Sequence, residues 1–91
     1  MELDTNSGGG GVETVTIPGV AASTAGPDQV CRSCQILHLS GTGTFMNITG
    51  AASATTWPLS STVPMYVPIQ NLNMLNFFGT AADKVIILWR D

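Results

Sequence analysis

The most conspicuous shortage in this sequence is of charge. Only 10% of its 91 residues are charged, against about 25% in an average soluble domain. Three basic residues (Arg32, Lys84 and Arg90) stand against six acidic ones, so the formal net charge is −3 and the isoelectric point is about 4.6. Nucleic-acid binding uses clustered lysine and arginine to displace counterions. The sequence has no such cluster, and we expect no nucleic-acid partner.

Long apolar segments are also missing. The longest apolar run covers residues 85–89, whereas a membrane-spanning helix needs about 20 such residues. The sequence starts Met-Glu-Leu-Asp, without the basic and apolar regions of a signal peptide. We therefore expect synthesis in a cytoplasm, no membrane partner, and two cysteines that begin as thiols.

Large side chains are scarce in the first third of the chain. Residues 1–29 contain no aromatic residue, and apart from Leu3 their only large aliphatic residues are Val12, Val15, Ile17 and Val20. The rest of the chain must supply most of the core, and a domain of about 60 residues is only marginally stable alone. We interpret residues 1–28 as an extended N-terminal arm with one short strand, and residues 29–91 as the domain.

Short β-prone segments separated by turn residues predict an all-β domain, a small β-sandwich or barrel. The run at 85–89 has no polar break, so we expect a central strand that is buried on both faces, with a second sheet or a neighbouring subunit covering the other side. Pro64 and Pro68 bracket residues 65–67, which marks that strand as an edge. The expected strands lie within residues 12–17, 29–40, 44–49, 65–67, 69–78 and 84–90.

Few residues could carry chemistry. Cys31, Cys34 and His38 offer three zinc ligands where a structural site needs four. A redox pair is expected to open a helix, whereas this pair opens a strand, so we favour a structural role for both thiols. In an extended segment they point to opposite faces, which predicts one in the core and one at the surface. We assign no catalytic residue, no metal and no cofactor, and we do not expect an enzyme.

His38 and the aromatic residues leave one alternative open. We interpret His38 as a half-buried residue that bonds to the backbone. Trp57, Tyr66 and Trp89 could form a platform for sugar rings, which would make the chain a small carbohydrate-binding domain. We favour the interpretation that Trp57 caps the core and Trp89 completes the last strand, because small β folds need large rings to fill the core.

The second half of the chain resembles small β-rich virion proteins of tailed bacteriophages, either head decoration (cement) proteins or base domains of head and tail fibres. The resemblance covers about residues 29–90. It rests on Trp57-Pro58-Leu59, residues 63–69, the asparagine- and leucine-rich residues 71–77, a Gly-Ala turn, and residues 84–89. The proline-bracketed strand and the Cys31–Cys34 motif depart from the family pattern.

The resemblance implies a structural protein on the surface of a virion, made in the host cytoplasm. Its partner would be the major capsid protein, and it would bind the capsid lattice as a homo-oligomer, commonly a trimer. The alternative is a carbohydrate-binding or fibre and tail attachment domain. An arm strand can add to the sheet edge of a neighbouring subunit. We therefore expect an interface formed by Val12, Val15, Ile17, Trp57, Pro64 and Tyr66.

Overall fold

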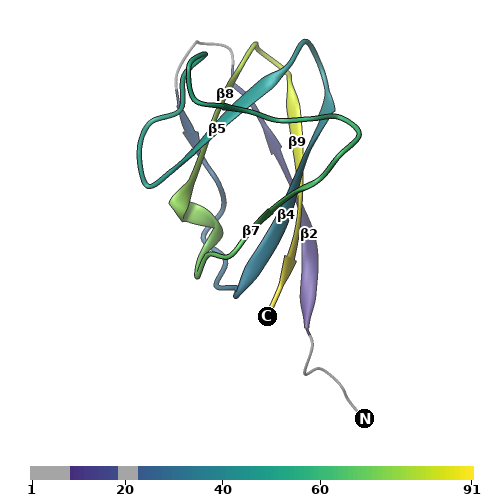
Figure 1. Cartoon of the computed structure of the whole chain (residues 1–91), viewed down its shortest axis with the longest axis vertical. Helices are drawn as coiled ribbons and strands as arrows, with labels where there is room; N and C mark the ends of the chain where they lie inside the picture. The colour runs from purple at the N-terminus through teal and green to yellow at the C-terminus, as the bar shows by residue number, and fades with distance from the viewer. Residues whose placement is uncertain (1–8, 19–22) are drawn as a thin grey trace.

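The protein folds as a sandwich of two four-stranded antiparallel sheets (Figure 1). The structure is a computed structural model that describes residues 9–18 and 23–91. The first sheet has the order β2 (Gly10–Thr16), β9 (Lys84–Arg90), β4 (Ser33–Ser40), β7 (Met65–Val67). The second has the order β3 (Thr24–Ala25), β8 (Leu75–Gly79), β5 (Thr44–Ile48), β6 (Trp57–Pro58). A 3₁₀ turn, η1 (Leu72–Met74), precedes β8. The expected all-β fold class is confirmed, and it is a sandwich.

The core lies between the sheets and follows from the two-residue period of the strands. In β4 and β9 every second side chain faces inward, so that Ile36, Val85 and Ile87 are fully buried. Phe77 and Leu75 of β8 meet them from the second sheet and are equally buried. Burial of each such side chain stabilises the fold by about 1.5–3 kcal/mol.

The strand expected in the N-terminal arm belongs to the sandwich, which corrects the division of the chain at residue 28. β2 pairs along its whole length with β9 of the same chain. The inward-facing side chains of Val15 and Ile17 are only 8% and 1% exposed. Because β9 of the same chain offers β2 an open edge, the alternating apolar side chains of β2 are buried without a neighbouring subunit. Within the arm, β3 adds a second strand that pairs with β8, and residues 1–8 and 19–22 lie outside the described residues.

The apolar run in β9 is central but is not buried on both faces. β9 lies between β2 and β4, as expected for the most apolar strand. Val85 and Ile87 face the core, whereas Ile86 and Leu88 face outward and only neighbouring side chains of the same sheet shield them. The second sheet covers one face of the first, so the single chain buries one face of β9, and cover of the other face by a neighbouring subunit stays a prediction.

Two turns at one end of the sandwich are joined through Asp83. Its buried carboxylate accepts hydrogen bonds from the backbone N–H groups of Thr80 (2.8 Å) and Thr42 (3.1 Å). The Thr80 bond contributes most to a pKa below the usual range for this carboxyl, with further help from the Thr42 bonds and His38 and against the opposing effect of burial. Gly41, at φ +110°, has no room for a side chain because a Cβ atom would overlap this carboxylate.

Candidate functional site

The outward face of the first sheet carries an apolar surface that no part of the described chain covers. We call it the outer patch; its members are Val12, Leu37, Pro64, Tyr66, Ile86 and Leu88. The pairing of the strands brings its members together, because Val12 is opposite Leu88 and Ile86 is opposite Leu37. Val12 and Tyr66, at opposite edges of the sheet, are 58% and 62% exposed. Contiguous apolar surface of this kind marks interaction sites in soluble proteins.

The outer patch contains two shallow hollows. A hollow of about 290 Å³ lies among its aliphatic residues beside Gln35, which is the polar residue at its centre. A second hollow of about 400 Å³ continues between Tyr66 and Leu88 towards Arg90. Gln35 is directly opposite Tyr66 in β7 and Leu88 in β9. The outer patch thus has an apolar centre with Gln35 inside it and two positive side chains, Lys84 and Arg90, at its rim, a composition that many protein interfaces share.

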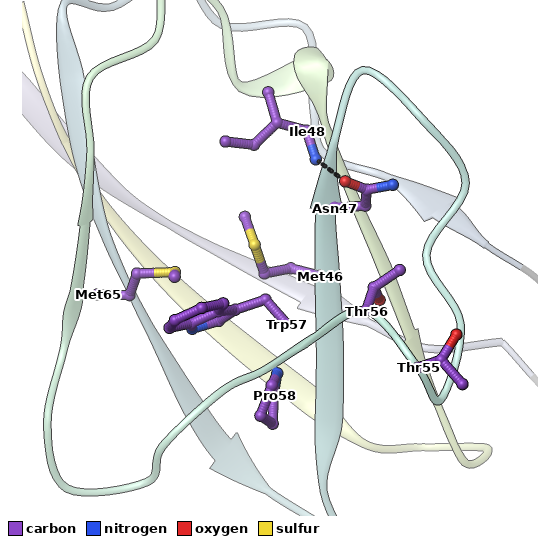
Figure 2. A pocket seen from close by; sticks show the side chains of 8 residues that line it. All are labelled: Met46, Asn47, Ile48, Thr55, Thr56, Trp57, Pro58 and Met65. Carbon is purple, nitrogen blue, oxygen red and sulfur yellow. Dashed lines mark hydrogen bonds between the residues drawn. The ribbon is translucent and has the colours of Figure 1, made fainter.

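A third hollow, of about 450 Å³, lies beside Trp57 of the edge strand β6. Figure 2 shows the indole between Met46 of β5 and Met65 of β7. Trp57 is 60% exposed, so the expectation that it caps the core is wrong. The polar groups beside the ring are already bonded within their own loop: Asn47 donates to Ala51 O, and the Thr56 hydroxyl donates to Ser53 O.

The three aromatic rings of the sugar-platform interpretation do not share one surface. Trp89 packs against the core, as expected for the last strand. Tyr66 points to the outer patch, and its neighbour Met65 faces the Trp57 hollow because successive side chains of a strand alternate. Any sugar site would therefore depend on Trp57 without Tyr66 and Trp89.

Both cysteines are buried, which corrects the expectation of one surface thiol. Cys34 faces the core from β4, whereas Cys31 precedes that strand and donates from its thiol to Ile69 O (3.3 Å). Burial raises the pKa of Cys34 to about 12 and, aided by Asp91, that of Cys31 as well. Protonated, enclosed thiols are poor nucleophiles and poor ligands. Cys31 escapes the expected alternation because it lies before the extended segment.

His38 is buried and holds a turn. Its Nδ1 atom is 3.1 Å from the Thr44 hydroxyl, and its Nε2 atom is 3.2 Å from Gly41 O. Both ring nitrogens are thereby committed, in agreement with the structural role expected for this residue. Within residues 9–18 and 23–91, no three His, Cys, Asp or Glu side chains lie close enough together to hold a metal ion.

The expected interface residues fall into three places. Val12, Pro64 and Tyr66 belong to the outer patch, Trp57 lies at the separate hollow, and Val15 and Ile17 are inside the core. The sequence analysis missed Leu37, Ile86 and Leu88. The signal for them was present in the alternation of β4 and β9, but the uninterrupted run 85–89 suggested burial on both sides.

Comparison of the chain with protein-family models, with curated proteins and with solved structures finds no match. In the part of the chain that the structure describes, no helix has the length and apolar character needed to cross a membrane.

Proposed function

We propose that this protein is a structural subunit of a bacteriophage particle that binds the capsid surface through the outer patch. The single observation that carries the proposal is the open apolar face of Val12, Leu37, Ile86 and Leu88 on a sheet whose other face packs against the second sheet. Such a face loses water-exposed apolar area when a protein surface covers it. The resemblance over about residues 29–90 suggests the particle and the major capsid protein as partner.

A capsid also suits the modest size of this surface. Each copy needs to contribute only a small contact, because many copies on one shell act together when the lattice holds neighbours close. In the described strands this face carries two charged side chains, Lys84 and Arg90 at the two ends of β9, and Glu13 lies on the opposite face of the sheet. Association would therefore depend weakly on salt, since screening acts on charge pairs and not on apolar burial.

The experiment counts copies of this protein in purified particles by quantitative mass spectrometry. In the double variant Ile86→Ser, Leu88→Ser we expect a folded protein that is absent from particles or reduced at least about tenfold, which corresponds to about 1.4 kcal/mol per copy. The matched control is Val30→Ser, Ile48→Ser, two exposed aliphatic residues outside the outer patch. Equal occupancy by both double variants, or parent protein missing from particles, would contradict the proposal.

Sugar binding at the Trp57 hollow is a second candidate, and the exposed indole over an open cavity is the observation that favours it. This candidate predicts quenching of tryptophan fluorescence on titration with a glycan, lost in Trp57→Ala and kept in Ile86→Ser, Leu88→Ser. The two candidates thus depend on different residues and can be separated with the same set of variants.

A further inference from the structure

The sandwich has one long open edge, formed by β2. Of the four edge strands in the described residues, β3 and β6 have two residues each and β7 has three, with prolines on both sides. β2 has seven residues, no proline, and Glu13 as its only charge. Proteins protect such edges with charges, bulges or prolines because an open strand recruits another. β2 has little of this protection.

The free backbone groups of β2 can be assigned from its ladder with β9. Ile17 N–H donates to Asp83 O, and Asp91 N–H donates to Gly9 O, both at 2.8 Å. Residues 9 and 17 thus face β9, and alternation of an antiparallel ladder gives the same direction to the odd-numbered residues between them. The N–H and C=O groups of Gly10, Val12, Thr14 and Thr16 consequently point to the open side.

We propose that β2 pairs antiparallel with β2 of a second copy of this chain, about a two-fold axis at Val12. Residues 10, 12 and 14 then lie opposite residues 14, 12 and 10 of the second copy. These are three hydrogen-bonded pairs, and each exchanges two N–H···O bonds. The two first sheets become one eight-stranded sheet. The proposal stands independently of the capsid, because it concerns the isolated protein.

The side chains select this register among those that the backbone permits. A two-fold axis at Glu13 would set two carboxylates directly opposite each other, which is unfavourable. An axis at Thr14 avoids this but sets Val12 against Thr16. With the axis at Val12, two exposed valines of the outer patch cover each other and the patch continues from one copy into the next.

An unpartnered indole lies beside the proposed axis at Val12. In the described residues, Trp89 Nε1 is the only buried side-chain nitrogen or oxygen without a hydrogen-bond partner. The ring lies over Gly11, and a Cβ atom at Gly11 would be 3.0 Å from this nitrogen. The proposed register sets Glu13 of the second copy opposite Gly11, with Cα atoms about 4.5 Å apart. The carboxylate thereby comes to the side of the sheet where the indole lacks an acceptor, and buried donors are normally bonded.

Cysteine cross-linking tests the register. At the two-fold axis the Cα atoms of a hydrogen-bonded pair are about 5.5 Å apart, a distance that suits a disulfide. Val12→Cys should therefore form a covalent dimer as the main species under mild oxidation with oxidised glutathione. Thr14→Cys is the matched control: its two copies are four residues out of register and should stay monomeric on a denaturing gel. The native cysteines are buried and do not compete. Cross-linking of Thr14→Cys in place of Val12→Cys would overturn the register.

Proline variants test the edge pairing in solution by sedimentation. Thr14→Pro removes an N–H that the ladder with β9 does not use, so the sandwich should fold, by circular dichroism, and sediment as a monomer. Thr16→Pro removes an equivalent N–H outside the proposed pairing and should leave the dimer intact. An antiparallel edge paired with itself gives a dimer, where the resemblance implied a trimer. A parent protein that is monomeric at high micromolar concentration, or trimeric, would overturn the proposal.

Discussion

The two faces of the first sheet carry similar side chains but differ in burial. The inner face presents Val15, Ile36, Val85 and Ile87 to the second sheet, and the outer face presents Val12, Leu37, Ile86 and Leu88 to the surroundings. Both sets come from the same strands at alternate positions. The apolar character of a strand therefore does not tell whether its own chain covers both faces. The apolar side chains that remain uncovered indicate the surface that another molecule could cover.

Neighbouring residues of β9 give the strongest test of this difference. Ile87 is 0% exposed and Leu88 is 40% exposed, on opposite sides of the same strand. We expect Ile87→Ala to lower the free energy of unfolding by about 2–5 kcal/mol, because it leaves a cavity in the core. Leu88→Ala should cost less than about 1 kcal/mol, as for surface substitutions. Urea denaturation of both variants measures the contrast, and similar losses would mean that the outer face is covered in the isolated protein.

Alkaline pH gives a second test of how well the inner face is sealed. Burial raises the pKa of Cys34 from 9.0 to about 12 in the folded protein. Between these two values the unfolded chain has released a proton that the folded chain retains, so stability is fully present below pH 9 and falls as the pH rises towards 12. The stability of Cys34→Ala should therefore decrease less than that of the parent over this pH range. Denaturation midpoints at pH 8 and pH 10.5 for parent and variant measure it, and parallel shifts would show that the Cys34 thiol is accessible to water.

The alternation of each strand could be read from the sequence, and this gave the fold class and most inner-face residues. Cys34, Ile36 and His38 share one face of β4 as predicted, and 65–67 is an edge strand between prolines. The pairing of β2 could not be read in the same way. It depends on an edge of β9 left open by residues more than 60 positions away, and local composition made the first 28 residues look too poor in apolar side chains to join the domain.

The candidate site was predictable only in part for the same reason. Pro64 and Tyr66, at the proline-bracketed edge strand, were among the expected interface residues, but Leu37, Ile86 and Leu88 needed the cross-strand register. Trp57 was misjudged because ring size favours burial, whereas its two-residue strand, β6, lies at the rim of the second sheet. Residue type predicted which side chains prefer to be covered, and tertiary arrangement decided which of them are.

The two turns that Asp83 joins lie at the end of the sandwich, and two glycines there test how tightly the turns are held. Gly41→Ala should cost about 1–3 kcal/mol, because a strained backbone adds to the overlap with the Asp83 carboxylate. Gly43→Ala is the matched control: Gly43 also has positive φ, at +143°, but no atom lies within 4 Å of its Cβ position. The difference between the two variants in chemical denaturation isolates the contact. Equal losses would show that the turn moves freely away from Asp83.

The smallest expected effect is the acid dependence of the same junction. The folded-state pKa of Asp83 lies below its ordinary value of 3.8, chiefly because the Thr80 N–H bonds to the charged form. A carboxyl of lowered pKa stabilises the fold at pH values above about 3.8, and this stabilisation is lost as the pH falls through the folded-state pKa. Asp83→Asn should accordingly lose less stability than the parent between pH 6 and pH 3 in urea titrations. Asp28→Asn, which changes an exposed carboxylate bonded to Asn71, serves as the control. If Asp83→Asn follows the parent and Asp28→Asn does not, the bonds at Thr80 and Thr42 do not depend on charge, and the turns are held by shape and backbone geometry alone.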